Sequence, residues 1–261
     1  MKKKCEGKIL KVQELAPDIF DMWIEASIAK DAKSGQFIGV FPKNQSTLLP
    51  RPISICEVDK EKGALRLVYR IAGKGTKEFS SYKEGDTVEV LGVLGNGYPL
   101  DEAEGKKIVL LGGGIGIPPI VQLAKELREK YPEASVTAAV GYRNDALFLK
   151  EELEKYADVL IATEDGSVGT KGNVMDAINE AGISPDIIFS CGPMPMLRAI
   201  KKYAEAKDIP AYISLEERMA CGVGACLGCV CKTTKKDHHS HVNNARICTD
   251  GPVFEAKEVD I

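Results

Sequence analysis

Short runs of alternating apolar and polar residues fill the first hundred positions, which is the pattern of half-buried strands. Turn residues at 16–18, 34–35, 60–63 and 84–86 separate these runs. Six short strands at roughly even spacing predict a small closed antiparallel barrel. The predicted strands are 7–14, 19–25, 36–41, 53–58, 65–71 and 87–91, and a short helical stretch covers 76–81.

From Lys106 the pattern changes to fully apolar runs that alternate with helical periodicity. Such alternation predicts right-handed βαβ units and a doubly wound, five-stranded parallel sheet with helices on both faces. The predicted strands are 108–111, 136–140, 159–162, 187–189 and 211–215, and the predicted helices are 118–130, 147–156, 174–180 and 195–207.

The residues after 215 form a third, small piece that is rich in cysteine. The predicted fold class is therefore β plus α/β. We expect three domains, which are an antiparallel barrel at 1–100, an α/β domain at 101–215 and a cysteine-rich domain at 216–261.

Charge and hydropathy exclude several classes of protein. Lys plus Arg is 35 and Asp plus Glu is 38 in 261 residues, a net charge of -3, whereas nucleic-acid binders usually carry a basic excess. The longest apolar stretch, Ile108–Val121, holds four Gly and two Pro and is too short to span a bilayer. No apolar segment follows the basic start, Met1–Glu6, so no secretory signal is predicted and we expect a cytoplasmic protein.

Cysteine spacing predicts a metal centre. Five of the eight cysteines fall between Cys221 and Cys248, and such local crowding in a reducing compartment indicates metal rather than disulfides. Cys221, Cys226 and Cys229 form C-x4-C-x2-C, the plant-type spacing of a [2Fe–2S] cluster, with Cys248 as the fourth ligand. The glycines within this run allow backbone amides to turn toward the cluster sulfurs.

Three alternatives accompany this interpretation. A zinc site prefers two C-x2-C units, and only one is available here. Cys231 could replace Cys229 as a ligand, although Cys229 keeps the x2 step intact. Rieske-type clusters use histidine ligands, and the same loop contains His238, His239 and His241. However, four cysteines already complete the ligand set, and three histidines in a polar loop are more typical of a solvated turn.

A glycine-rich turn follows the strand at 108–111 and opens the next helix. Gly112, Gly113, Gly114 and Gly116 would let phosphates approach the backbone near a helix N-terminus, so this turn predicts nucleotide binding. The turn departs from the G-x-G-x-x-G fingerprint, and a tight turn without a ligand is the alternative.

Two further turns follow predicted strands, at the sheet edge where ligands of open α/β sheets bind. They are 163–167 and the Cys191-Gly192-Pro193-Met194 turn. Arg143 could meet the 2′-phosphate of NADP or lie in a surface loop, so these residues leave NAD and NADP open.

The barrel carries a second group of candidate residues. Arg51 and the amides of Gly75 and Thr76 could hold a pyrophosphate, whereas Ser54 and the region of Tyr69 could face a flavin ring. A solvated arginine and an ordinary turn are the alternative.

The order of barrel, glycine turn and C-x4-C-x2-C resembles the ferredoxin–NADP reductase superfamily with a C-terminal iron–sulfur domain. Within it the chain is most similar to the electron transfer subunit of NAD-dependent, two-subunit dihydroorotate dehydrogenase. The segments that carry the resemblance are 51–54, 73–76, 112–116, 191–194, 216–226 and 248–254.

This resemblance implies roles for individual residues. The cluster ligands fall on Cys221, Cys226, Cys229 and Cys248, and NAD(H) lies over the glycine turn with Cys191 near the nicotinamide. One departure is Ile53, because many superfamily members have an aromatic residue there that stacks on the flavin. The implied FAD site comprises Arg51, Pro52, Ile53, Ser54, Val68, Tyr69, Arg70, Gly75 and Thr76, and the implied NAD(H) site comprises Gly112, Gly113, Gly114, Gly116, Cys191 and Gly192.

The resemblance also implies a partner and a place in pyrimidine biosynthesis. Electrons from dihydroorotate pass from FMN in a catalytic subunit through the [2Fe–2S] cluster and FAD to NAD+, in an assembly of two copies of each subunit. This chain then needs no acid–base catalytic residue. The rival functions are a flavin and iron–sulfur subunit of a sulfhydrogenase, an NADH-dependent ferredoxin–NADP oxidoreductase, and a non-enzymatic zinc-binding module.

Overall fold

A computed structural model describes residues 3–44, 46–236 and 241–261. The chain divides into two compact units. The first contains Met1–Gly97, Glu216–Val230 and Arg246–Pro252, and the second contains Tyr98–Leu215, Cys231–Ala245 and Val253–Ile261. The predicted cysteine-rich domain, 216–261, thus contributes segments to both units, and the three-domain division stays a prediction.

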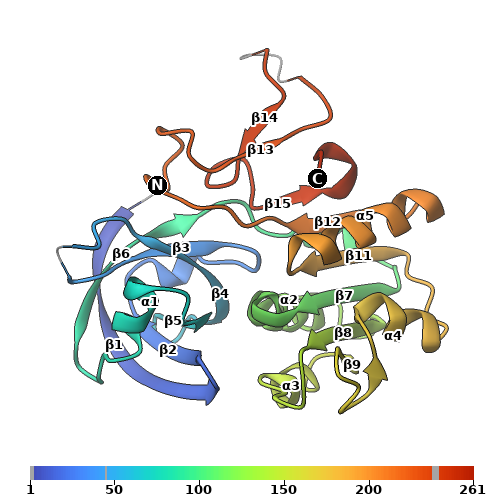
Figure 1. Cartoon of the computed structure of the whole chain (residues 1–261), viewed down its shortest axis with the longest axis horizontal. Helices are drawn as coiled ribbons and strands as arrows, with labels where there is room; N and C mark the ends of the chain where they lie inside the picture. The colour runs from blue at the N-terminus through green and yellow to red at the C-terminus, as the bar shows by residue number, and fades with distance from the viewer. Residues whose placement is uncertain (1–2, 45, 237–240) are drawn as a thin grey trace. The chain divides into compact units, whose positions relative to one another are not determined.

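Six antiparallel strands of the first unit close into a barrel, which confirms the predicted N-terminal fold. The order around the barrel is β1-β2-β5-β4-β3-β6 (Figure 1). The strands are β1 (Lys3–Ala16), β2 (Ile19–Glu25), β3 (Phe37–Phe41), β4 (Arg51–Asp59), β5 (Ala64–Arg70) and β6 (Thr87–Leu94), and a short 3-10 helix, η1 (Ala29–Asp31), follows β2.

Alternation along the barrel strands builds its core. In β6 the side chains of Val88 and Val90 are buried, whereas Glu89 between them is exposed. Each fully buried aliphatic side chain stabilises the fold by about 1.5–3 kcal/mol relative to exposure. Helix α1 (Lys74–Phe79) is anchored to this core because Phe79 is fully buried in it, with its ring centroid 6.0 Å from that of Tyr69.

The second unit holds a seven-stranded sheet in the order β10-β9-β8-β7-β11-β12-β15. All neighbours are parallel except β12 and β15. The strands are β7 (Ile108–Gly113), β8 (Val136–Tyr142), β9 (Asp158–Thr163), β10 (Thr170–Lys171), β11 (Ile187–Cys191), β12 (Ala211–Ser214) and β15 (Val253–Glu255).

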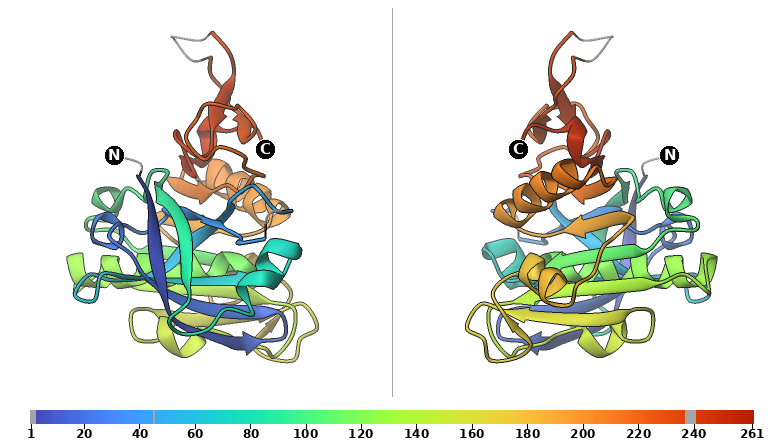
Figure 2. Two further views of the ribbon diagram at one scale, coloured as in Figure 1. Left: turned by 90° about the vertical axis from the view of Figure 1, so that its left-hand side faces the viewer. Right: turned by 90° about the vertical axis from the view of Figure 1, so that its right-hand side faces the viewer.

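Helices cover both faces of this sheet, which confirms the doubly wound prediction. The strand order reverses at β7 and β11, so right-handed crossovers place α2 and α3 on one face and α4 and α5 on the other. The right-hand view of Figure 2 shows α4 and α5 in front of the strands. The helices are α2 (Ile117–Lys130), α3 (Lys150–Leu153), α4 (Val174–Glu180) and α5 (Met194–Lys207), with 3-10 helices η2 (Leu100–Ala103), η3 (Gly114–Gly116) and η4 (Ala256–Glu258).

The α/β part of the structure differs from the predicted elements in two main respects. The sheet has seven strands rather than five, because the short strands β10 and β15 extend it at its two edges. The helix predicted at 147–156 shortens to α3, because Leu149 adopts a left-handed backbone with φ of 64° and interrupts the helical hydrogen bonding before Lys150.

The cysteine-rich segment forms little regular structure. Strands β13 (Val230–Lys232) and β14 (Asn244–Arg246) pair as a two-stranded sheet, and β15 joins the edge of the large sheet. Within the described part of the chain, no helix has the length and apolar character needed to cross a membrane.

Candidate functional site

The predicted phosphate clamp of the barrel comes together in the structure. Arg51 begins β4, and its side chain lies against Gly75 in the first turn of α1. A Cβ on Gly75 would stand 2.6 Å from Nε and 2.9 Å from Cζ of Arg51, so the guanidinium fits only because residue 75 has no side chain. A fixed cation beside the amides of a helix start is a suitable cradle for a pyrophosphate.

Thr76 shapes this turn through its hydroxyl. Its Oγ1 accepts hydrogen bonds from the amides of Ala72 at 2.8 Å and Gly73 at 3.2 Å, and it donates to the carbonyl of Gly73. The side chain of Thr76 is therefore engaged in the turn, and its amide is the part that suits a phosphate.

The remaining residues of the predicted flavin site divide between the inside and the outside of the barrel. Ile53 and Tyr69 are 6% and 3% exposed and belong to the hydrophobic core of the barrel. Pro52 and Arg70 are exposed, Ser54 is half-buried and Val68 is buried outside that core cluster.

Tyr69 is buried in the barrel core, and its expected place beside a flavin ring stays a prediction. Among the described residues its buried hydroxyl has no hydrogen-bond partner. Burial raises the pKa of Tyr69 well above its ordinary value.

The glycine turn lies between β7 and α2, as predicted, and packing explains its glycines. A Cβ on Gly116 would stand 2.3 Å from the carbonyl oxygen of Cys191, and one on Gly113 would stand 2.7 Å from the sulfur of Met196. Gly114 has a φ of 52°, a left-handed conformation that favours glycine. The turn and the segment after β11 therefore meet backbone to backbone, which brings Gly112, Gly113, Gly114, Gly116, Cys191 and Gly192 into one place.

The start of α2 has fewer free backbone N–H groups for binding an anion than an ordinary helix N-terminus has. Pro118 and Pro119 have no amide hydrogen, and the amide of Ile117 donates to the carbonyl of Gly114. Cys191 is 1% exposed at the end of β11. The hydroxyl of the buried Tyr98 donates to the neighbouring carbonyl of Ser190 at 2.9 Å, and burial raises the pKa of this tyrosine.

Backbone amides point at the sulfurs of the predicted cluster ligands. The amides of Val223 and Cys226 each lie 3.4 Å from Sγ of Cys221, and the amide of Gly228 lies 3.4 Å from Sγ of Cys226. The hydrogen bond from Val223, followed by that from Cys226, lowers the pKa of the Cys221 thiol to about 6 despite partial desolvation. A thiol with this pKa is largely thiolate at neutral pH, which is the form that binds iron.

The four predicted ligands belong to the same unit as the barrel. A Cβ on Gly222 would lie 3.2 Å from Cδ1 of Leu94 on β6, so the cysteine loop packs directly on a barrel strand. Cys229 and Cys248 are buried, and the amide of Ile247 donates to the carbonyl of Cys229 at 2.9 Å. The segment that carries Cys248 is therefore bonded to the end of the C-x4-C-x2-C run.

The choice of a [2Fe–2S] cluster over a zinc ion rests on the cysteine spacing. In the described part of the chain, no group of three or more His, Cys, Asp or Glu side chains is placed to hold a metal ion. His238 and His239 lie outside the described residues.

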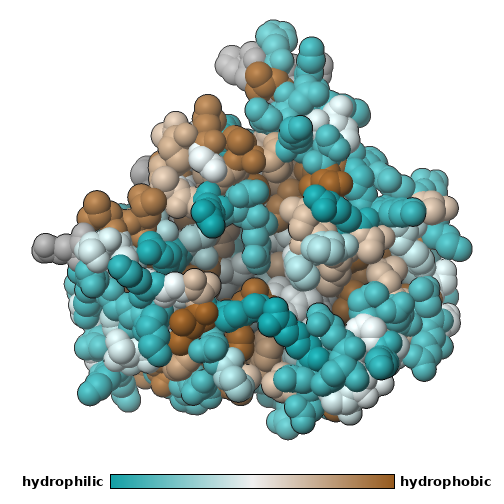
Figure 3. Space-filling model, in the orientation of Figure 1, coloured by the Kyte–Doolittle hydropathy of each residue, from teal (hydrophilic) through white to brown (hydrophobic). Residues whose placement is uncertain are grey.

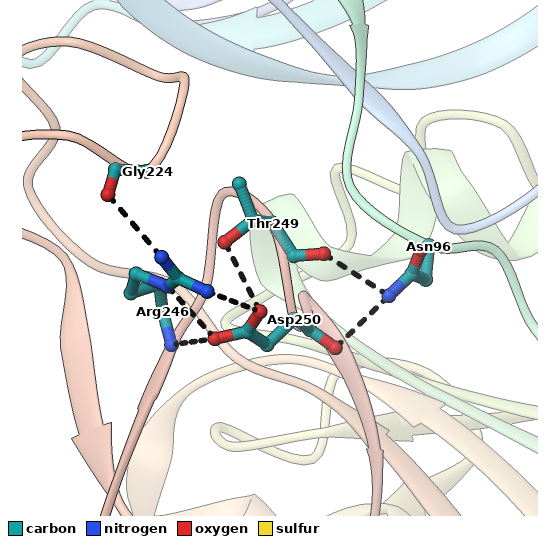
Figure 4. A network of polar contacts seen from close by, with 5 residues as sticks. All are labelled: Asn96, Gly224, Arg246, Thr249 and Asp250. Carbon is teal, nitrogen blue, oxygen red and sulfur yellow. Dashed lines mark hydrogen bonds and ion pairs between the residues drawn. The ribbon is translucent and has the colours of Figure 1, made fainter. Parts of the chain in front are cut away.

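A polar network around Cys248 escaped the sequence analysis (Figure 4). Arg246 and Asp250 flank this cysteine and bind each other, and Asn96 from the end of the barrel reaches the same turn. The spacing of Arg246 and Asp250, two residues before and two residues after a predicted ligand, was the sequence signal that could have indicated this network.

Arg143, the residue considered as a contact for the 2′-phosphate of NADP, is exposed.

Two family models match the chain. One is the iron–sulfur cluster binding domain of dihydroorotate dehydrogenase B, over residues 216–260, and the other is an oxidoreductase NAD-binding domain, over residues 110–202. The chain is 43% identical over 259 residues to the dihydroorotate dehydrogenase B (NAD(+)) electron transfer subunit of Listeria monocytogenes serotype 4b (strain F2365), covering 99% of each protein. The corresponding subunit of Geobacillus sp. (strain WCH70) is 40% identical over 263 residues, again with 99% coverage of each.

Solved structures share the fold. An NADH-dependent reduced ferredoxin–NADP oxidoreductase, studied for flavin-based electron bifurcation, matches with a TM-score of 0.84 and 31% identity, covering 97% of this chain and 89% of that one. A ferredoxin NADP+ reductase from Neisseria gonorrhoeae with bound FAD and NADP matches with a TM-score of 0.63 and 21% identity, over 79% of this chain and 92% of that one. At that identity the second likeness shows the fold alone.

Proposed function

Because the chain belongs to the family of dihydroorotate dehydrogenase B (NAD(+)) electron transfer subunits, we propose that it carries electrons from a catalytic subunit to NAD+. The reaction of the assembled enzyme is dihydroorotate + NAD+ → orotate + NADH + H+. The catalytic subunit performs the oxidation of dihydroorotate, so this chain contributes cofactor binding and no acid–base residue.

One observation carries the proposal. The Arg51–Gly75 clamp and all four candidate ligand cysteines belong to one compact unit, and the cysteine loop packs on barrel strand β6. A bound flavin and a [2Fe–2S] cluster together supply exchange between two-electron and one-electron transfer. A chain that holds both in one unit is suited to that exchange.

The proposed FAD site uses the barrel. Arg51 and the amides of Gly75 and Thr76 would bind the pyrophosphate, and Ser54 and Val68 would lie along the flavin. The proposed NAD(H) site uses the glycine turn with Cys191 and Gly192, where backbone rather than side chains would meet the dinucleotide.

Cys221, Cys226, Cys229 and Cys248 are the proposed cluster ligands. The amides of Val223, Cys226 and Gly228 support this set, because hydrogen bonds to the sulfurs stabilise the negative charge of thiolates bound to iron. Cys231 is the control, since it lies two residues after Cys229 and its thiol is half-buried.

The proposed partner is an FMN-containing catalytic subunit, assembled as two copies of each chain. Val223 and Leu227 support docking near the cluster loop, because they are 43% and 62% exposed apolar residues within it. Figure 3 shows hydrophobic side chains gathered over the orange loop that precedes β13 in Figure 1. Light scattering of the purified complex would measure the stoichiometry.

Reconstitution tests the function. The chain is mixed with the FMN-containing catalytic subunit of the same organism, and NADH formation from dihydroorotate is followed at 340 nm. NADH should form only when both chains are present. A chain that carries FAD and a cluster but forms no NADH with that subunit would shift the proposal to a hydrogenase or ferredoxin system.

A cysteine pair tests the route. Cys226→Ser should abolish electron transfer from the catalytic subunit while NADH still reduces the bound flavin, and Cys231→Ser should leave both reactions intact. Unimpaired transfer in a cluster-free Cys226→Ser protein would refute the route, and cluster loss in Cys231→Ser would move the ligand assignment from Cys229 to Cys231.

A further inference from the structure

The turn that carries Cys248 is closed by an ion pair between its two flanking residues. Nε of Arg246 lies 3.1 Å from Oδ2 of Asp250, and Nη2 lies 3.2 Å from Oδ1, so the guanidinium binds the carboxylate with two hydrogen bonds. The backbone amide of Arg246 also donates to Oδ2, at 2.8 Å. Such bidentate pairs fix orientation as well as distance.

The same guanidinium reaches the other ligand segment. Nη1 of Arg246 donates to the carbonyl of Gly224 at 3.4 Å, and Gly224 lies between ligands Cys221 and Cys226 (Figure 4). A Cβ on Gly224 would stand 2.8 Å from Cγ2 of Thr249, so the loop and the turn are in direct contact there. One side chain therefore spans both segments that supply cluster ligands.

The barrel holds this turn from the other side. Nδ2 of Asn96 donates to the carbonyls of Thr249 and Asp250 at 3.2 and 3.0 Å. The backbone amide of Asn96 donates to the carbonyl of Gly251 at 2.7 Å. Three stretches of chain, far apart in the sequence, are thus joined around Cys248.

We propose that Arg246 is a positioning residue for the iron–sulfur centre: its fork, held by Asp250, fixes the Cys248 turn against the Cys221–Cys226 loop. By binding the carbonyl of Gly224, it also fixes the loop in the conformation that directs amides at the sulfurs of Cys221 and Cys226. This inference rests on the proposed [2Fe–2S] site.

Two measurable consequences follow. First, a loosened turn should release the cluster faster. Second, weaker amide–sulfur hydrogen bonds should make the reduction potential more negative, because these bonds favour the reduced, more negatively charged cluster. Global stability should change little, since the side chains of Arg246 and Asp250 are 42% and 38% exposed and exposed ion pairs contribute little to stability.

The experiment compares Arg246→Gln and Arg246→Lys with the wild type in the full chain with bound FAD. Iron and labile sulfide are measured per chain, cluster loss is timed in excess chelator, and the midpoint potential is obtained by EPR-monitored titration. Both variants should lose the cluster at least about fivefold faster. Both should also shift the reduction equilibrium at least about threefold toward the oxidised form, a change of about 28 mV at 59 mV per tenfold for one electron.

The lysine variant separates positioning from charge. Lysine keeps the positive charge but cannot bind two carboxylate oxygens and a carbonyl as a planar fork does. Arg246→Lys should therefore resemble Arg246→Gln in potential and cluster loss. Lysine behaving as the wild type in both measurements would overturn the proposal in favour of a simple charge effect.

Controls keep the result interpretable. Asn96→Ala leaves the Arg246–Asp250 pair in place and is therefore a milder variant, to be used if the arginine variants fold poorly. It should also speed cluster loss. Lys62→Gln removes another exposed ion pair of the same unit, with Asp59, and should change neither cluster loss nor potential. A wild-type chain without iron and sulfide would refute the proposed cluster site itself, whereas a loaded wild type with unaltered arginine variants would refute only the role of Arg246.

Discussion

Replacing Gly75 with alanine should change cofactor affinity and chain stability in opposite directions. The new Cβ would stand 2.6, 2.9 and 3.1 Å from Nε, Cζ and Nη2 of Arg51. All three atoms belong to the end of a flexible side chain, so the arginine can move away while the fold stays intact. The guanidinium would then leave its place beside the start of α1.

The loss of FAD affinity and the change in stability have separate physical causes. A hydrogen bond to a charged group contributes about 1.5–3 kcal/mol, so loss of the clamp should weaken FAD binding by roughly ten- to a hundredfold. Alanine is a better helix former than glycine by about 0.5–1 kcal/mol, so the cofactor-free chain should be as stable as the wild type or slightly more stable.

Flavin fluorescence quenching during titration of the cofactor-free chain gives the Kd, and urea unfolding of the same sample gives the stability. Gly73→Ala is the matched control, because its backbone is extended with φ of 172° and no atom lies within 4 Å of the added Cβ. It should bind FAD as the wild type does. Equal affinity in Gly75→Ala and the wild type, or equal loss in both glycine variants, would refute the clamp.

Three further predictions concern stability, each measured by urea unfolding. Gly116→Ala should lower the unfolding free energy by about 1–3 kcal/mol, since its methyl would meet the Cys191 carbonyl at 2.3 Å; an unchanged midpoint would contradict that close approach. Asp21→Ala should lower the unfolding free energy by about 3 kcal/mol, because it removes the carboxylate that lies 2.9 Å from the guanidinium of the buried Arg66. The double variant Asp21→Leu with Arg66→Met should lower the unfolding free energy by less, and a larger loss in the double variant would disprove this account. Tyr69→Phe should leave the cofactor-free chain unchanged or up to about 1 kcal/mol more stable, because its buried hydroxyl lacks a partner among the described residues; a clear loss would reveal one.

The periodic parts of the fold were predictable because their signals are local. Alternation in strands such as β6 and the unbroken apolar run of β7 follow directly from which faces are buried. The interruption before α3 was not predictable, since leucine rarely adopts the left-handed conformation found at Leu149.

In the candidate site, too, some features have a local sequence signal and others depend on contacts between distant residues. Cysteine spacing is a local signal, and so is the glycine turn. By contrast, Asn96 bonds the turn after Cys248 across 154 positions of sequence, and no local pattern indicates that pairing. The close approach of Gly116 to Cys191 likewise depends on two neighbouring parallel strands, so the packing reason for that glycine became visible only in the structure.

Strand β15 limits how this chain can be cut or recombined. It pairs antiparallel with β12 through Ser214 and Val253, Ile213 and Phe254, and Tyr212 and Glu255, and so covers the main-chain groups along that edge of the sheet. A fragment ending after Leu215 would expose them as a template for intermolecular strand pairing, and it should aggregate. Grafting the iron–sulfur segment onto another reductase would therefore require transplanting its sheet neighbour as well.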